Sequence, residues 1–349
     1  MKKILLAIII CLSTSRGFAQ DSTKKATLNI SGSVDAYYRY NFANAKDSLH
    51  TNNLTSFTNT QNSFEIGMAS VKLDGSIGKI GATVDLAFGK RANEFSYNDN
   101  ATLAAVKQAY LTYSPSDKIK FTFGKWATYV GYELVDAYLN RNYSMDYMFS
   151  YGPFFHTGLK ADVTIGSFGF MFGIVNPTDY STASFTKKNT IAQLSANAID
   201  GKLKAYINYV GGKDFSGVNT INQVDLVVNG TITSKFSVGY NGTVKSVKPI
   251  AGGAKSWWGS AIYLNADPTQ LFGITLRGEY FDDKKNVATI GTGVFDATLS
   301  ANIRIDNLTI IPEFRLDSAK DSLFYKNSDS EIPTSKSTGS FILAMIYHF

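Results

Sequence analysis

The chain has 349 residues and a formal net charge of +6 at pH 7, and it contains 29 glycines but only 7 prolines. If residues 1–19 are an export signal, removing it leaves 31 of the 34 basic residues against 28 acidic residues, a net charge of +3. This mild excess does not indicate a nucleic-acid partner. After residue 12 no run of about twenty apolar residues could form a transmembrane helix.

The N-terminus has the three parts of a secretory signal. Lys2 and Lys3 are followed by an unbroken apolar run, and Gly17 and Ala19 supply the small residues of a cleavage site. We therefore predict that residues 1–19 are cleaved and that the mature chain begins at residue 20. The single cysteine, Cys11, lies inside this signal, so the mature chain would contain no cysteine.

Apolar and polar residues alternate with a period of two along most of the remaining chain. This alternation indicates strands with one apolar face and one polar face. Clear examples, in chain order, lie at residues 28–39, 155–164, 235–245, 272–280, 295–304 and 308–317. Residues 61–76 alternate less cleanly, because the apolar parity changes between Met68 and Val71, and we predict a β-bulge there.

Short and long connections also alternate along the chain, and the short ones carry the residues that favour tight turns. The eight longer, polar connections are residues 41–60, 92–101, 128–151, 178–188, 212–219, 248–254, 283–291 and 319–336. The pattern predicts that residues 20–349 form an all-β, antiparallel, up-and-down transmembrane barrel of about 16 strands, with short periplasmic turns and long external loops. The alternative is a soluble β-protein, which rarely keeps turns and loops in strict alternation over so many strands.

The final strand has an apolar face that ends on an aromatic residue. Residues of one parity are all apolar in this segment: Phe341, Leu343, Met345, Tyr347 and Phe349. We expect this face to contact lipid and the opposite parity, which includes Ala344, to contact water in the lumen. The segment resembles the closing strand of bacterial outer-membrane barrels, and this resemblance implies that Phe349 is read by the assembly machinery. The alternative is an ordinary buried strand at the end of a soluble domain.

The connection at residues 128–151 would be the third external loop, and it is the longest of the eight. The block from residue 124 to residue 158 contains Gly124-Lys125, Gly131-x-Glu133, Phe149-x-Tyr151-Gly152 and Pro153-Phe154-x-His156-Thr157-Gly158. This block resembles the signature of the OmpL-like β-barrel porin family, although the region around Tyr138 and Leu139 and the residue Asp146 depart from it. The resemblance implies an outer-membrane porin and does not identify a solute.

The same loop contains seven aromatic residues, which need a surface to pack on, and the inside of the barrel offers one. A loop folded into the lumen would narrow the channel, as the third loop does in general porins. The candidate constriction residues are then Glu133, Asp136, Arg141 and Asp146. The alternatives are a loop packed over the mouth of the barrel or one held in a subunit contact.

The polar faces of the predicted strands carry more basic than acidic residues. Charged side chains inside a pore set its ion preference, so this excess indicates a weak preference for anions. The candidate lumen-lining residues are Arg39, Lys160, Lys202, Lys204, Arg277, Glu279, Arg304, Glu313 and Arg315. The alternative for each of them is a pairing with a neighbouring strand that only solvates the wall.

Motifs for catalysis are weak. His156 on a lumen-facing strand could serve as a general base in a barrel hydrolase, but no serine in a Gly-x-Ser-x-Gly setting accompanies it. We therefore expect no enzymatic activity, no cofactor and no metal site. The three tryptophans, Trp126, Trp257 and Trp258, lie near the predicted loop-side strand ends and indicate an interfacial aromatic girdle.

Together these features predict a porin in the outer membrane of a Gram-negative cell, which lets ions and small hydrophilic solutes diffuse through a water-filled lumen. Its expected partners are outer-membrane lipid, these solutes and the assembly machinery, and a homotrimer is considered because trimers are common among general porins. The competing hypothesis is a structural or adhesive barrel with a plugged lumen and partner-binding loops.

Overall fold

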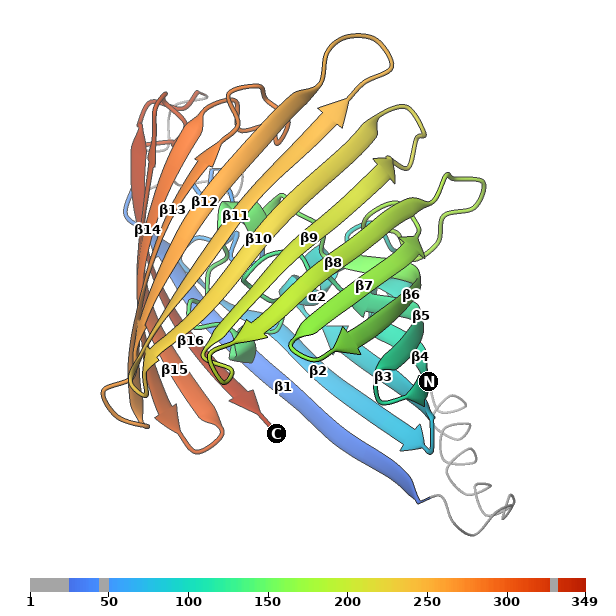
Figure 1. The fold of residues 1–349 in the computed structure, drawn as a ribbon. Coiled ribbons are helices and arrows are strands. Elements are labelled where there is room, and N and C mark those ends of the chain that lie inside the picture. Colours follow the sequence, from blue (N-terminus) through green and yellow to red (C-terminus); the bar gives the residue numbers. More distant parts are fainter. Residues whose placement is uncertain (1–24, 44–49, 327–331) are drawn as a thin grey trace, which may run out of the picture.

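The computed structural model describes residues 25–43, 50–326 and 332–349, so the predicted export signal at residues 1–19 lies outside the described residues. Sixteen strands form one closed barrel (Figure 1). The strands are β1 Ala26–Asn41, β2 Ser63–Ile77, β3 Ile80–Phe88, β4 Val106–Ser116, β5 Ile119–Ala127, β6 Phe155–Ile165, β7 Phe168–Val175, β8 Asn189–Ala198, β9 Leu203–Lys213, β10 Thr220–Thr233, β11 Phe236–Lys248, β12 Lys255–Ala266, β13 Phe272–Asp282, β14 Gly293–Ile305, β15 Leu308–Ala319 and β16 Ser337–His348.

Every strand pairs antiparallel with its neighbours in the chain, and β1 pairs with β16 to close the barrel. Tyr38 lies opposite Leu343 in this closing pair. Beyond it, Gly32 and Phe349 exchange two backbone hydrogen bonds of 3.0 Å. The predicted up-and-down barrel of sixteen strands is therefore confirmed, and Phe349 lies at the end of its seam.

The outer surface of the barrel is apolar. Phe64 on β2 is 86% exposed, and Leu343 and Phe349 at the end of the chain are 40% and 51% exposed. An exposed band of this kind is stable only against hydrocarbon, as in transmembrane barrels. The outward parity predicted for the terminal strand is thus confirmed.

The predicted irregularity in the second strand is a bulge at Gly67. Asp35 on β1 lies opposite Met68, whereas the next residue, Ala36, lies opposite Ile66. Gly67 is thus the extra residue, and it lies one residue before the segment from Met68 to Val71 in which the bulge was predicted. A side chain at Gly67 would collide with the Asp35 carboxylate, which is why glycine occupies this position.

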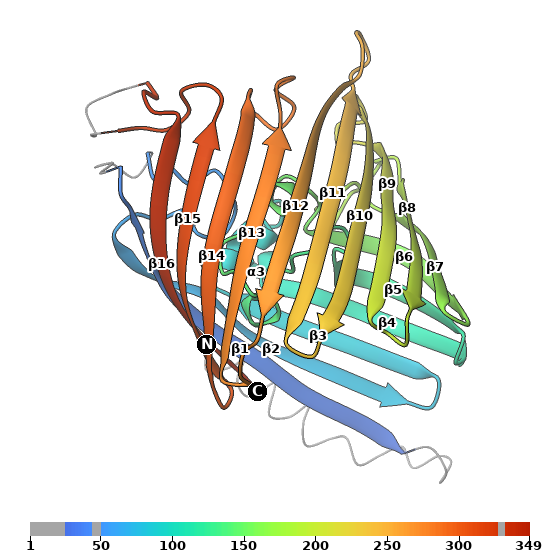
Figure 2. The same ribbon diagram turned by 60° about the vertical axis from the view of Figure 1, so that its left-hand side comes forward.

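Tight turns lie at one end of the barrel together with the C-terminus, and longer connections lie at the other end (Figures 1 and 2). Two of the long connections contain short helices. The β3–β4 connection contains α2 (Lys90–Phe95) and α3 (Ala101–Ala104), and the β5–β6 connection contains the 3-10 helix η1 (Ala137–Leu139) and α4 (Tyr147–Ser150). Both connections run inside the ring of strands in the two views. Among the described residues, no helix is both long and apolar enough to cross a membrane.

Candidate functional site

The connection between β5 and β6, residues 128–154, is called loop 3 here, and it lies in the lumen. Its first residues bind the inner face of three successive strands. The Tyr129 hydroxyl donates to a carbonyl of β9 at 2.6 Å, and Gly131 N–H donates to Asp225 on β10 at 3.0 Å. Tyr132 N–H then donates to Asn241 on β11 at 3.3 Å. The loop therefore starts at the outer rim and turns inward along the wall.

Two carboxylates of the wall hold the loop backbone. Glu313 on β15 accepts the N–H groups of Tyr143 and Ser144 at 2.7 and 3.0 Å. Glu279 on β13 accepts those of Tyr147 and Met148 at 2.7 and 2.9 Å. Both glutamates are almost completely buried. Each carboxylate oxygen thus satisfies one buried backbone donor through a charge-assisted bond, the strong type of hydrogen bond.

A buried network of ion pairs lies between these two carboxylates, Glu279 and Glu313. Arg277 on β13 binds Glu133 of loop 3 at 2.6 Å and Asp296 on β14 at 2.8 Å. Arg315 on β15 binds Asp296 at 3.0 Å and donates to the Met145 carbonyl at 2.6 Å. Removing one member would leave a buried charge without its partner, which is far more costly than losing an exposed ion pair.

Asp146 completes this network from the loop side. Its carboxylate accepts from the Tyr263 hydroxyl on β12 at 2.7 Å and from Phe149 N–H at 2.6 Å, which caps α4. Its own N–H donates to Glu133 at 2.8 Å. Burial raises the pKa of Asp146, and the Arg277 guanidinium opposes that shift. Glu133 and Asp146 therefore face the wall and each other and do not face open water.

The middle of loop 3 packs against the closing strands. The Tyr143 ring lies 5.2 Å from the Tyr37 ring on β1, and its hydroxyl donates to Asp35 at 2.5 Å. Tyr143 also belongs to a buried cluster with Ile342 and Ala344 of β16. Ala344 faces inward as predicted, but it is 0% exposed. The expectation that it meets water is wrong, because loop 3 fills this part of the lumen.

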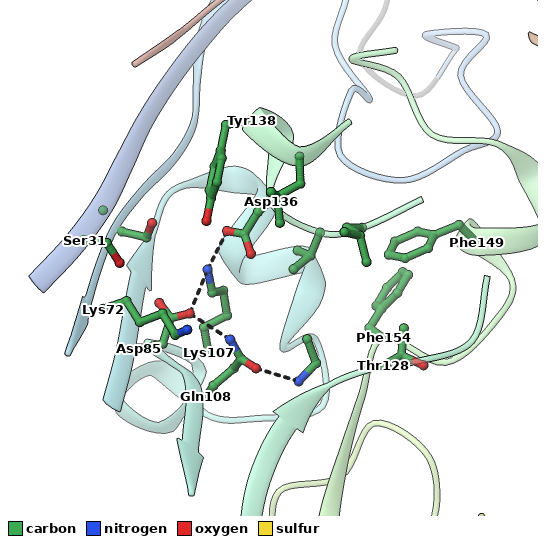
Figure 3. Close-up of a pocket in the computed structure, with 16 residues that line it drawn as sticks. Ser31, Lys72, Asp85, Lys107, Gln108, Thr128, Asp136, Tyr138, Phe149 and Phe154 are labelled. Carbon is green, nitrogen blue, oxygen red and sulfur yellow. Dashed lines mark hydrogen bonds and ion pairs between the residues drawn. The ribbon is translucent and has the colours of Figure 1, made fainter. Parts of the chain in front are cut away.

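Loop 3 also contacts the wall formed by β3 and β4. Lys107 on β4 lies between two carboxylates, 2.6 Å from Asp136 of loop 3 and 3.0 Å from Asp85 on β3. Figure 3 shows the three side chains converging beneath Tyr138, and Gln108 donates to the same Asp85 oxygen that Lys107 contacts, at 2.9 Å. They border a cavity of about 210 Å³ between the loop and the wall. Asp136 thus anchors η1 to β4, which lies seven strands from the Asn241 contact on β11 in the closed ring.

The loop reaches the turn end of the barrel at Arg141. Its guanidinium binds Asp267 in the β12–β13 turn at 2.9 Å and Thr275 on β13 at 2.7 Å. Arg304 on β14 binds the same aspartate at 2.8 Å. Nearby, the Tyr138 ring stacks on His348 with centroids 5.2 Å apart. Loop 3 consequently runs from the end of the barrel with the long connections to the end with the tight turns, and Arg141 keeps partial access to solvent.

The remaining lumen candidates occupy different environments. Arg39 is buried and donates to three carbonyls of the β1–β2 connection, whereas Lys160 pairs with Asp162 on its own strand at 2.9 Å. Lys204 lies on the inward parity of β9 and is exposed. Lys202 is not in the wall, because β9 begins one residue later and Lys202 lies in the preceding turn.

Sequence reasoning missed Asp179, in the connection after β7. One carboxylate oxygen accepts the N–H groups of Phe154 and Phe155, at 2.7 and 3.0 Å, where loop 3 enters β6. Burial raises the pKa of Asp179 to about 6. No local pattern distinguishes it from other loop acids, because its partners are more than twenty residues away in the chain.

The predicted tryptophan girdle is wrong for two of its three members. Trp258 faces outward, but Trp126 and Trp257 are buried inside the barrel. Trp257 has the inward parity of β12 and packs on Phe281 with ring centroids 5.1 Å apart. His156, the candidate base, is also buried, with Nε2 3.2 Å from the Thr128 hydroxyl. Within residues 25–43, 50–326 and 332–349, no group of three His, Cys, Asp or Glu side chains is arranged to hold a metal ion.

Residues 27–349 match the model of the family "Putative beta-barrel porin-2, OmpL-like". The chain belongs to this family. The predicted resemblance is therefore confirmed, and it extends over nearly all of the barrel. Family and fold together suggest a channel without enzymatic activity. A comparison with curated proteins gave no match.

Solved structures with a similar fold include outer-membrane porins and channels. The anion-selective porin from Comamonas acidovorans has a TM-score of 0.64 and 12% identity, over 93% of this chain and 100% of that chain. The channel DcaP of Acinetobacter baumannii has a TM-score of 0.62 and 13% identity, over 95% and 99%. OmpT of Vibrio cholerae has a TM-score of 0.60 and 14% identity, over 95% and 99%. These likenesses concern the fold, and with the family they support an outer-membrane location and a porin-like channel.

Proposed function

We propose that the protein lets ions and small hydrophilic solutes diffuse passively across the outer membrane, and that loop 3 is the constriction. The observation that carries this proposal is the course of loop 3 across the lumen, from Asn241 on β11 to Lys107 on β4, seven strands away in the closed ring of sixteen. A sixteen-stranded barrel without such a loop is wide enough for an aqueous channel. The loop therefore narrows the channel, and solutes pass through the part of the lumen that the loop leaves open.

The charged residues of loop 3 have different roles in this proposal. Glu133, Asp136 and Asp146 are buried in contacts that fix the loop. Arg141 retains 25% of its side-chain exposure, so it is the charge that permeating solutes meet at the periplasmic mouth. Its contribution to selectivity is moderated by Asp267, which binds both Arg141 and Arg304.

The proposal includes the route to the membrane. Residues 1–19 act as a cleaved export signal, and residues 20–349 form the mature barrel. The paired terminal residue Phe349 acts as the assembly signal, with the assembly machinery and outer-membrane lipid as partners. A homotrimer is included by analogy with general porins. We infer no catalytic step, cofactor or metal.

The decisive test is single-channel conductance of the purified protein and of a variant lacking residues 131–149. The deletion removes the part of the loop that crosses the lumen, so conductance per channel should rise clearly while the barrel still inserts. Insertion is checked by heat-dependent migration on a gel. Unchanged conductance in a folded deletion variant would contradict the role of loop 3.

The second candidate is a structural or adhesive barrel with a closed lumen. The near-complete burial of Glu133, Tyr143 and Asp146 favours it, because these contacts leave little space on their side of the lumen. Folded wild-type protein that forms no channel, together with loops that bind a partner, would support this candidate.

A further inference from the structure

A cavity of about 740 Å³ opens among the long connections, at the end of the barrel opposite the tight turns (Figure 1). It is lined by residues of the β3–β4, β7–β8 and β9–β10 connections, by the end of loop 3 and by Lys245 on β11. Sites for small organic molecules usually have volumes of about 300–1,000 Å³. The cavity, called the vestibule here, therefore has the size of a solute-binding site.

Lys245 gives the vestibule a cation that lacks a counter-ion. It lies on the inward parity of β11 and is partly buried. Its ammonium donates to the Tyr151 carbonyl at 3.0 Å, and it forms no ion pair with a carboxylate of the described residues. By contrast, the ammonium of Lys125 on β5 lies 2.9 Å from Asp99. Because an ammonium has three donors, Lys245 can offer two of them to an anionic group of a ligand.

Glu94 on α2 supplies the opposite charge. One of its oxygens accepts the Phe57 N–H at 2.6 Å, and the other accepts no hydrogen bond within the described part of the chain. The other two carboxylates at the vestibule are already engaged: Asp179 accepts from loop 3 and from Tyr97, and Asp214 accepts backbone N–H groups of its own connection. Glu94 is therefore the carboxylate with a whole oxygen left for an ammonium group of a ligand.

Aromatic side chains add apolar surface to the vestibule. The rings of Tyr180 and Phe215 stack with centroids 4.1 Å apart, and Phe215 is 44% exposed. Tyr97 is 58% exposed, although its hydroxyl donates to Asp179 at 3.1 Å. Covering such rings with an apolar group removes their surface from water, which is favourable. A solute that matches the vestibule thus carries an anionic group, a cationic group and an apolar side chain.

We propose that the vestibule binds α-amino acids and short peptides with apolar side chains, with the carboxylate at Lys245 and the ammonium at Glu94. A neutral saccharide would cover the rings but leave Lys245 without a counter-ion. A simple anion would pair with Lys245 but meet the negative charges of Glu94 and Asp214. This site deepens the channel function proposed above, because it names a class of solute that the barrel would collect at its mouth.

The test removes one charge of the ligand at a time. The ligands are the dipeptide of phenylalanine and leucine, its N-acetyl form, which lacks the ammonium, and its C-terminal amide, which lacks the carboxylate. Dissociation constants are measured by isothermal titration calorimetry on the purified protein in detergent, after the heat-dependent gel shift has shown a folded barrel. The wild-type protein should bind the free dipeptide about tenfold more tightly than either blocked form, as expected for the loss of one hydrogen-bonded charge.

Two substitutions assign each charge of the ligand to its partner. Lys245→Gln should abolish the preference for the free carboxylate over the amide and keep the preference for the free amine. Glu94→Gln should do the reverse. Lys204→Gln and Glu65→Gln are the matched controls, because they remove the same charges from inward-facing residues outside the vestibule and should keep both preferences.

Equal affinity of the wild-type protein for the three ligands, or no binding of the free dipeptide, would overturn the site, and neither result depends on the folding of a variant. A control substitution that abolishes a preference as fully as its vestibule counterpart would also overturn it. These results do not touch the channel function, because binding is measured without transport. Conversely, a protein that binds the free dipeptide with both preferences but forms no channel would refute the proposed function and leave the site standing.

Discussion

Glu313→Gln tests whether wall carboxylates hold loop 3 in place. The two oxygens of Glu313 accept the N–H groups of Tyr143 and Ser144, and one of them also accepts from Ser300 at 2.7 Å. Glutamine has nearly the same shape, but its amide nitrogen cannot accept a hydrogen bond. One buried N–H of loop 3 therefore loses its acceptor, while the packing around it is preserved.

The expected cost follows from that single lost acceptor. A buried donor without a partner costs about 1–3 kcal/mol. The other anchors keep the loop docked on average, so the cost appears as more frequent local opening. Taking about 2 kcal/mol, the opened population should rise about thirtyfold, because about 1.4 kcal/mol corresponds to a factor of ten.

Cysteine labelling measures this opening directly. Ser144 is completely buried, and the single cysteine of the sequence lies in the predicted signal, so Ser144→Cys provides a unique reporter. A water-soluble maleimide should label it about thirtyfold faster in the Glu313→Gln background. Glu65→Gln on β2 is the matched control, because Glu65 makes no described hydrogen bond to loop 3. Equal labelling rates with and without Glu313→Gln, or an equal increase in the control, would refute the clamp.

Three further predictions concern stability and assembly. Leu343→Arg should lower the free energy of unfolding by about 2–4 kcal/mol in a lipid refolding titration, because it places a charge in hydrocarbon. Ala344→Arg should also destabilise the barrel, because loop 3 fills the space next to Ala344. Deletion of residues 131–149 should therefore relieve the Ala344→Arg defect and leave the Leu343→Arg defect unchanged. Removal of Phe349 should slow assembly in cells and leave the stability measured by refolding in vitro nearly unchanged. Assembly is measured by pulse-chase labelling, with the heat-dependent gel shift as the sign of a folded barrel. The pKa of Asp179 in the folded state, about 6, exceeds its ordinary value of 3.8, so between these pH values the folded state holds a proton that the unfolded chain has lost. Stability should therefore fall as the pH rises from about 4 to about 6. Denaturation midpoints measured over this pH range should show that Asp179→Asn flattens the dependence.

The barrel could be predicted from the sequence because its determinants are local. Alternation with a period of two assigns each residue of a strand to one face, and short turns fix which strands pair. Leu343 and Phe349 were placed outward on this basis, and the structure has them there. The bulge at Gly67 was also visible, because an extra residue changes the parity of the apolar positions.

The contents of the lumen could not be predicted in the same way. Parity places Ala344 and Trp257 but does not show what they meet, and both are buried by segments distant in the chain. Glu279 and Glu313 were expected to line the pore, yet each binds two backbone groups of loop 3. Which backbone donors need an acceptor depends on the path of the loop, and no residue pattern encodes that path.

The contacts of Tyr143 have a consequence for the order in which the protein folds. Its hydroxyl binds Asp35 on β1, its ring packs beside Ile342 on β16, and its N–H binds Glu313, 170 residues later in the chain. Bonds between such distant residues form late, because the intervening chain must first be ordered. The sheet therefore has to roll up around residues 128–154 before these bonds can form. We expect nascent barrels that lack the last strands to expose residues 128–154 to proteases. When this segment docks, its contacts in the lumen should stabilise the pairing of β1 with β16.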